Sequence, residues 1–261
     1  MDLDPLVLAA LGATAFCAGF IDSVVGGGGL LQIPALFSAL PRELPATLFG
    51  TNKIASIVGT ANAAWRYTRH VKMPWRTTLP AASAALVCSY LGAMAVTYLP
   101  RELLRPLILL LLIGAAIYTF RRKEFGATHQ PRHSGQREIL LALLLGGSIG
   151  FYDGFFGPGT GSFLIFLFVR VFGFDFLHAS AAAKVVNVAT NLAATAYFVP
   201  HGYYLLLVGS LMAVANVGGS FVGTRLALKN GSAFVRTIFL FVVSALIVKF
   251  AWDTVRHGLA A

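Results

Sequence analysis

The chain has 261 residues, of which 57% are hydrophobic and 11% are charged. Because a soluble domain usually carries about 25% charged residues, this chain has too few charges to cover a water-exposed surface. Its formal net charge of +10 does not indicate nucleic-acid binding, since the basic residues cluster at 66–76, 121–137 and 225–236, beside apolar runs. The composition predicts an all-α polytopic membrane protein whose partner is the lipid bilayer.

Apolar runs predict helices along the whole chain. They fall at 5–21, 28–40, 46–65, 77–99, 103–120, 138–152, 155–172, 177–199, 203–224 and 233–251. The one long polar stretch, 121–137, is basic and contains glycine and proline, which is typical of a loop. We therefore expect a first repeat over 1–120, a cytoplasmic linker over 121–137 and a second repeat over 138–261.

The two halves repeat at a constant offset of 131 positions. The segment GFIDSVVGGGG at 19–29 aligns with GFYDGFFGPGT at 150–160, and further along the same register Lys53 meets Lys184. Such a gapless match of rare residues indicates an internal duplication, which is common in secondary transporters.

The basic clusters predict how the halves cross the membrane. If all three clusters face the cytoplasm, segments 5–40 and 138–172 must each enter the membrane and return to the same side. Each half then becomes a broken, re-entrant hairpin plus three transmembrane helices, the two repeats have inverted topology, and both termini are periplasmic. In the alternative, each broken segment crosses once, the N-terminus is cytoplasmic and the repeats are parallel.

Glycines predict where each hairpin turns. Glycine allows positive φ and close approach of backbones, and a helix that starts after a turn offers unpaired N–H groups and partial positive charge to an anion. The alternative is that these glycines only let helices pack closely. The predicted turn residues are Gly26, Gly27, Gly28 and Gly29 in the first half and Gly157, Gly159, Thr160 and Gly161 in the second.

Two lysines lie inside predicted membrane helices at equivalent positions of the repeat. An intramembrane lysine indicates a functional site, although one near a helix end can instead extend its ammonium group to the membrane surface. Polar side chains surround both lysines or share their helix faces, which suggests two walls of one anion path. The predicted anion-binding set is Lys53 with Thr51, Asn52, Ser56 and, more weakly, Gln32, together with Lys184, Asn187 and Asn191.

Asp22 and Asp153 precede the two predicted turns by four residues. Each could pair with a lysine, brace the end of a broken helix, or carry a coupling proton, because a low-dielectric site favours the neutral carboxyl group. The sequence leaves these three roles open.

The sequence contains no recognisable catalytic or cofactor-binding pattern. It lacks the H-E-x-x-H pair and the G-x-S-x-G nucleophile elbow, and Cys17 and Cys88 have no metal-ligand spacing. Histidines such as His70, His129 and His178 are interpreted as anchors at the membrane surface. We therefore expect a protein that is not an enzyme and that uses no metal or cofactor.

The motifs resemble one family of bacterial membrane transporters. GFIDSVVGGGGLLQIPAL, TLFGTNKIAS, GFYDGFFGPGTGSFLIF and AAAKVVNVATN are similar to segments of the sulfite exporter TauE/SafE family, and the resemblance covers nearly the whole chain. It implies an inner-membrane permease for small anions, chiefly sulfite and sulfonates. The second half departs from the first by reading AAAK in place of TNK, so the site is not fully symmetric.

These observations together predict a secondary transporter that exports a small anion, most simply sulfite or an organosulfonate. One repeat would rock against the other, with a proton as the candidate coupling ion. An anion channel or a non-transporting membrane scaffold stays as the alternative. The oligomeric state is open, a homodimer being one option.

Overall fold

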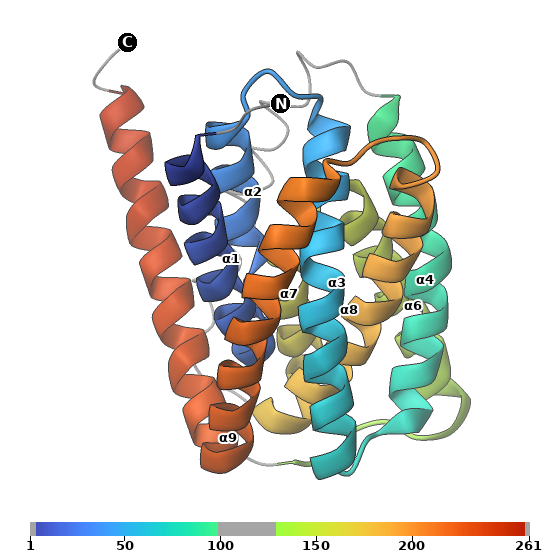
Figure 1. The fold of residues 1–261 in the computed structure, drawn as a ribbon. Coiled ribbons are helices and arrows are strands. Elements are labelled where there is room, and N and C mark those ends of the chain that lie inside the picture. Colours follow the sequence, from blue (N-terminus) through green and yellow to red (C-terminus); the bar gives the residue numbers. More distant parts are fainter. Residues whose placement is uncertain (1–3, 99–128, 259–261) are drawn as a thin grey trace.

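The computed structural model describes residues 4–98 and 129–258, so the predicted run at 103–120 and residues 121–128 of the linker lie outside the described residues. The described residues form helices joined by short connections and contain no strand (Figure 1). The helices are α1 (Pro5–Val25), α2 (Gly29–Ala39), α3 (Pro45–His70), α4 (Trp75–Thr97), α6 (Gly135–Phe155), α7 (Thr160–Leu167) with a π-helical continuation η1 (Phe168–Phe172), α8 (Phe176–Phe198) and α9 (Leu206–Gly258).

Local chemistry sets several of these boundaries. Asp4 caps α1 by accepting a hydrogen bond from the N–H of Leu6, and Pro5 occupies the first helical position, where no N–H partner is needed. Gly26 ends α1 in the left-handed region. In α9 the backbone departs from helical geometry at Gly231, where two helices meet.

The helix boundaries follow the offset found in the sequence. Helices α2, α3 and α4 begin at residues 29, 45 and 75, and α7, α8 and α9 begin at residues 160, 176 and 206, each 131 positions later. The first and second halves therefore place equivalent residues on equivalent helices.

The ends of the helices gather at two opposite ends of the molecule. In Figure 1 the start of α1 and the connections 40–44 and 199–205 lie at the upper end, whereas the connection 71–74, residues 129–134 and the Gly231 kink lie at the lower end. The α1–α2 pair thus starts and finishes at the upper end, and the α6–α7–η1 segment starts and finishes at the lower end.

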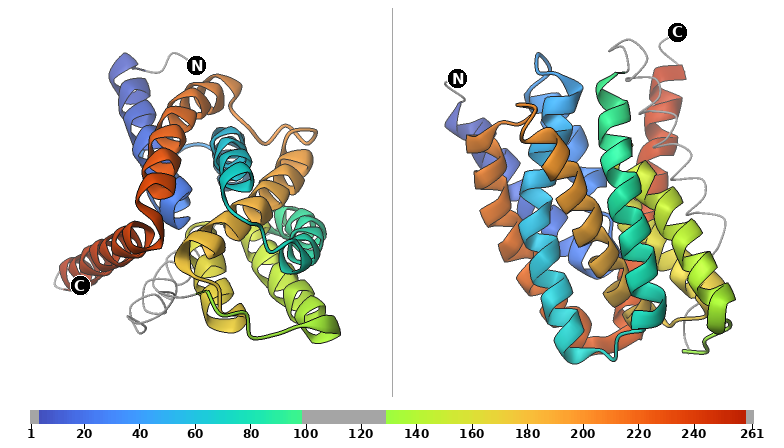
Figure 2. Two further views of the ribbon diagram at one scale, coloured as in Figure 1. Left: turned by 90° about the horizontal axis from the view of Figure 1, so that it is seen from below. Right: turned by 90° about the vertical axis from the view of Figure 1, so that its right-hand side faces the viewer.

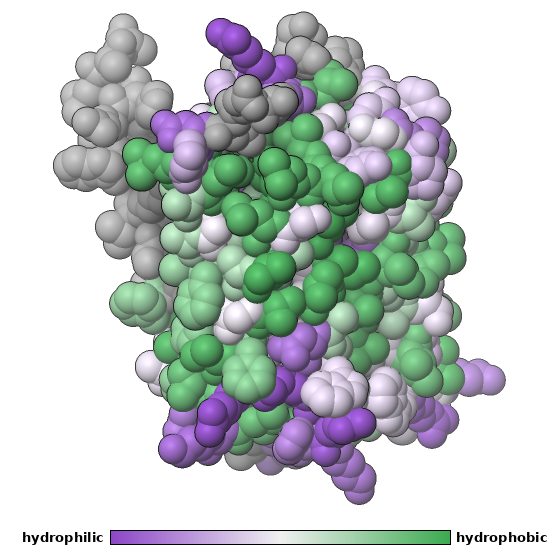
Figure 3. Space-filling model, in the orientation of Figure 1, coloured by the Kyte–Doolittle hydropathy of each residue, from purple (hydrophilic) through white to green (hydrophobic). Residues whose placement is uncertain are grey.

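The surface and the helix lengths fit a membrane environment. Four helices are long and apolar enough to cross a bilayer, namely Pro5–Val25, Trp75–Thr97, Gly135–Phe155 and Leu206–Ile238. Figure 3 shows apolar side chains over the middle of one face, with hydrophilic side chains gathered below them. Helices α3 and α8 have 26 and 23 residues but are more polar, because they carry the buried lysines and their polar neighbours.

The helices pack into two bundles, and each bundle takes helices from both halves of the chain (Figure 2). We call α1, α2, α3 and residues 206–230 of α9 the first bundle, and α4, α6, α7, η1 and α8 the second bundle. The most extensive contacts are those of α1 with α9 and of α6 with α4, and the bundles meet mainly where α3 lies against α8.

Small residues allow this exchange of helices between the halves. Gly19 of α1 lies directly against the backbone of Asn216 in α9, and Gly150 of α6 lies in the same way against Ala85 of α4. Both contacts join equivalent positions, so α1 is held by α9 of the second half and α6 by α4 of the first half. The largest buried apolar cluster extends across both bundles, from Tyr67 to Phe168.

Candidate functional site

Both predicted hairpins break at glycines inside the bundle. In the first half α1 ends at Val25 and α2 begins at Gly29; in the second half α6 ends at Phe155 and α7 begins at Thr160. The turns are therefore residues 26–28 and 156–159. The prediction that Gly29, Thr160 and Gly161 belong to the turns was wrong: they start the following helices. The first helical turn accepts such residues because its N–H groups need no partner within the helix.

The first turn touches the start of α7 at the boundary between the bundles. A Cβ atom on Gly26 would overlap the backbone of Gly161, and a Cβ on Gly161 would overlap Gly26. The N–H of Ser162 donates to the carbonyl of Gly26 over 3.2 Å. Position 26 requires glycine because its φ is +77° and because the backbone of Gly161 lies so close. Position 161 requires glycine for the close approach alone.

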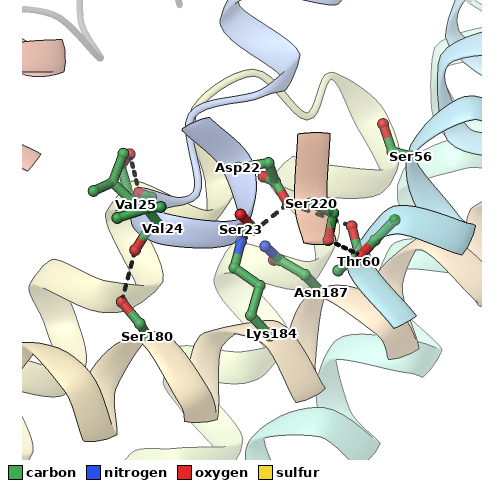
Figure 4. A network of polar contacts seen from close by, with 12 residues as sticks. Asp22, Ser23, Val24, Val25, Ser56, Thr60, Ser180, Lys184, Asn187 and Ser220 are labelled. Atoms are coloured by element: carbon green, nitrogen blue, oxygen red, sulfur yellow. Dashed lines mark hydrogen bonds and ion pairs between the residues drawn. The ribbon is translucent and has the colours of Figure 1, made fainter. Parts of the chain in front are cut away.

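Hydroxyl groups from other helices satisfy the last carbonyls of α1. Ser180 donates to the carbonyl of Val24 over 3.0 Å (Figure 4). Tyr67 donates to the carbonyl of Ser23 over 3.0 Å, and Ser162 donates to that of Val25 over 2.7 Å. The end of a buried helix needs such partners because no water reaches its carbonyls. The sequence analysis missed these three hydroxyls, although two are serines within apolar helices.

The predicted lysines and aspartates form two crossed ion pairs. Lys53 Nζ lies 2.9 Å from Asp153 Oδ2, and Lys184 Nζ lies 3.0 Å from Asp22 Oδ2. Each pair joins a lysine of one half to an aspartate of the other, and each joins the first bundle to the second. Figure 4 shows Lys184 extending from α8 to Asp22 at the end of α1.

The surroundings of the pairs exclude the alternative in which the lysines extend to the membrane surface. Lys53 is 3% exposed and Lys184 is 0% exposed. Asp153 also accepts a hydrogen bond from the hydroxyl of Thr160 over 2.8 Å, and Asp22 accepts one from Thr60 over 3.4 Å. Of the three roles open to the aspartates, the geometry displays ion pairing; proton carriage stays a prediction.

A second polar cluster lies between α2, α3 and α9. Gln32 Oε1 accepts from the hydroxyl of Ser56 over 3.1 Å and from Asn216 Nδ2 over 3.3 Å. Gln32 Nε2, Asn52 Oδ1 and Asn187 Oδ1 are buried and find no hydrogen-bond partner in the described part of the chain. Since buried polar atoms are normally paired, these three atoms offer contacts to a bound molecule or water.

The other predicted site residues do not all lie beside the ion pairs. Thr51 has a structural role: its hydroxyl donates to the carbonyl of Thr47 over 2.7 Å and accepts from the N–H of Leu205 over 2.9 Å. Asn191 is buried on α8, and Asn187 Nδ2 faces Gly161, beside the contact of Gly26 with α7. Lys53 Nζ likewise lies close to Gly157. The structure thus gathers the lysines, aspartates and glycine turns, and leaves Thr51 apart from them.

Helices that break inside an apolar bundle, next to buried charges from two repeats, are typical of a secondary transporter. The comparisons agree with this class. The family model described as Sulfite exporter TauE/SafE matches residues 11–250. The chain belongs to the TauE/SafE family and is a membrane transporter of that family.

Several curated relatives are similar over nearly their whole length. The probable membrane transporter protein ORF9 of Sinorhizobium sp. is 37% identical over 253 residues, which cover 97% of this chain and 95% of that protein. YfcA of Escherichia coli K12, also named a probable membrane transporter protein, is 34% identical over 256 residues, covering 98% and 93%. A probable membrane transporter protein of Haemophilus influenzae is 31% identical, covering 97% and 98%. No solved structure matches the chain.

Proposed function

We propose that this protein is a secondary transporter that moves a small anion, sulfite or an organosulfonate, out of the cytoplasm. The observation that carries the proposal is the pair of crossed, buried ion pairs at the boundary between two bundles. The lysine ammonium groups supply positive charge where the broken helices meet. The name of the family model supports the sulfur-containing substrate and the direction of transport.

Anion binding at this site would proceed by exchange of partners. A sulfite or sulfonate group carries negative oxygens, as does a carboxylate, and can therefore replace an aspartate at a lysine ammonium group. Gln32 Nε2, buried without a partner in the described residues, could donate a further hydrogen bond. The glycine turns 26–28 and 156–159 would add backbone N–H groups at the starts of α2 and α7.

Charge balance suggests how a proton would take part. Each ion pair is neutral, so adding an anion leaves one uncompensated negative charge in a low-dielectric interior, which is costly. A proton on the displaced aspartate removes that charge. Asp22 is the better candidate, because its side chain is 19% exposed whereas that of Asp153 is 6% exposed.

The membrane arrangement that fits this model has the lower end of Figure 1 in the cytoplasm. That end carries Arg66, Arg69, Lys72, Arg132 and Lys229, as the positive-inside rule requires. The α1–α2 and α6–α7–η1 segments would then be re-entrant hairpins of an inverted repeat in the inner membrane, with both termini periplasmic. Because each bundle mixes both halves, alternating access would move bundle against bundle, in place of repeat against repeat.

Anion flux into proteoliposomes tests the proposal. Lys53→Ala and Lys184→Ala should each reduce sulfite flux to the level of empty liposomes, because each removes a buried positive charge at the site. Lys72→Ala is the matched control: it removes an exposed lysine from the connection between α3 and α4 and should leave flux unchanged. Wild-type flux in both site variants would contradict the model.

Two further measurements separate folding from function and a transporter from a channel. The double variant Lys184→Met with Asp22→Asn removes both charges of one pair, which often restores stability. It should stay folded and remain inactive. Preloading the liposomes with unlabelled sulfite should accelerate uptake of labelled sulfite in a transporter, whereas a channel gives no such exchange.

A further inference from the structure

One cluster of titratable side chains lies outside the ion-pair site. His129, in the middle of the linker, meets Asp175 and His178 at the start of α8, at the lower end of the molecule in Figure 1. One potential ligand atom of each side chain lies within 4.8 Å of the corresponding atoms of the other two. The rings of His129 and His178 have centroids 4.2 Å apart.

Main-chain hydrogen bonds hold His129 beside α8. The N–H of Gln130 donates to the carbonyl of Gly173 over 2.8 Å, and the N–H of Arg132 donates to Phe172 over 3.0 Å. The His129 ring also stacks on Phe174, with centroids 5.3 Å apart. The linker is therefore aligned along the connection between η1 and α8, and the position of the ring follows from that alignment.

Asp175 has two tasks in this arrangement. It caps α8 by accepting from the N–H of His178 over 2.8 Å, and its second oxygen lies 2.8 Å from His178 Nδ1. Ser232 donates to the carboxylate over 3.0 Å. These hydrogen bonds fix the carboxylate of Asp175 and the ring of His178 side by side at the start of α8.

We propose that His129, Asp175 and His178 bind a divalent first-row transition metal such as Zn²⁺. Two imidazole nitrogens and one carboxylate oxygen form a ligand set that suits this ion, with a fourth position left for water. Asp175 brings the negative charge that a cation needs next to the positively polarised start of α8. A bound metal would fasten the linker to the helix that carries Lys184.

The sequence analysis did not expect a metal site because the ligands lie far apart in the chain. Residue 129 belongs to the linker and residues 175 and 178 to the second half, so no short spacing reveals them. The folding of the linker onto the η1–α8 connection is what unites them.

Isothermal titration of the full-length protein with Zn²⁺ tests the site. The protein is purified without a polyhistidine tag and stripped with a chelator. We expect one equivalent to bind to the wild type, and His129→Ala and His178→Ala each to weaken binding by about tenfold or more. Asp175→Asn should weaken binding while keeping the helix cap, because asparagine is also a good N-cap residue.

A matched control and a stability readout complete the test. His133→Ala removes another linker histidine, which contacts Phe172 in place of α8, and should bind Zn²⁺ as the wild type does. Zn²⁺ should raise the melting temperature of the wild type and of His133→Ala, and not that of His178→Ala. The proposal is overturned if the wild type binds no more Zn²⁺ than the His129→Ala/His178→Ala double variant.

Discussion

The two crossed ion pairs occupy equivalent positions of the repeat but differ in their surroundings. Both are short, at 2.9 Å for Lys53–Asp153 and 3.0 Å for Lys184–Asp22. The side chain of Asp153 is 6% exposed and receives a hydrogen bond from Thr160, whereas that of Asp22 is 19% exposed and receives a longer one from Thr60. The Lys53–Asp153 pair is sealed at both ends, whereas the Lys184–Asp22 pair can be reached from outside only at Asp22.

This difference in exposure suggests that the two equivalent ion pairs have different roles. A sealed ion pair resists exchange, because its partners cannot be solvated while they separate. The Lys53–Asp153 pair is therefore suited to holding the bundles together, and the Lys184–Asp22 pair to releasing its carboxylate when an anion arrives. The duplication supplies two similar sites, and the unequal neighbours give them different tasks.

The largest expected effect separates the two aspartates. Asp153→Asn leaves the Lys53 ammonium group without a countercharge in a sealed site, and we expect it to cost about 3–5 kcal/mol of unfolding free energy. Asp22→Asn should cost about half of that or less, since the partly exposed side chain at position 22 gives water a route toward the buried Lys184 in the variant. Chemical unfolding of both purified variants in the same detergent measures the difference. Equal losses would show that the two pairs are equally sealed.

The second prediction concerns the contact of Gly26 with Gly161, at the boundary between the bundles. Gly26→Ala places a Cβ in the left-handed region, which costs about 1–2 kcal/mol, and overlap with Gly161 adds about 1–3 kcal/mol. The variant should unfold at lower temperature and lose anion flux, because both pairs depend on the bundles meeting closely.

Gly202→Ala provides the matched control. Gly202 also has a positive φ, of +75°, but a Cβ there would meet no atom within 4 Å. This variant should therefore show only the backbone strain and keep its flux. If both glycine variants behaved alike, the contact between Gly26 and Gly161 would have no special importance.

Many residues of the two ion-pair sites can be predicted from the sequence, because the constant offset of 131 shows which residues of the two halves are equivalent. The glycine turns, the buried lysines and the acidic residues before the turns all follow from residue types at one offset. The turn boundaries were misplaced at Gly29, Thr160 and Gly161, because a glycine or threonine suits the first turn of a helix as well as the end of a loop.

The crosswise pairing could not be predicted in the same way. An internal repeat shows that Asp22 corresponds to Asp153, but not which half supplies the partner of each. That depends on the exchange of helices between the bundles, which rests on backbone contacts such as Gly19 against Asn216. The unequal exposure of the aspartates has the same origin, since it reflects three-dimensional packing and not the local sequence.

The smallest expected effect uses the two threonines that donate to the carboxylates. Thr160 and Thr60 are similarly buried, at 3% and 2% exposed, but their hydroxyls lie 2.8 Å and 3.4 Å from Asp153 and Asp22. Valine preserves the shape and removes the donor. Because a hydrogen bond to a charged group contributes about 1.5–3 kcal/mol when its geometry is good, Thr160→Val should destabilise the protein by about that amount and Thr60→Val by less than about 0.5 kcal/mol. Chemical unfolding of the two variants measures both values, and a larger loss for Thr60→Val would reverse the assignment of the sealed and the exchangeable pair.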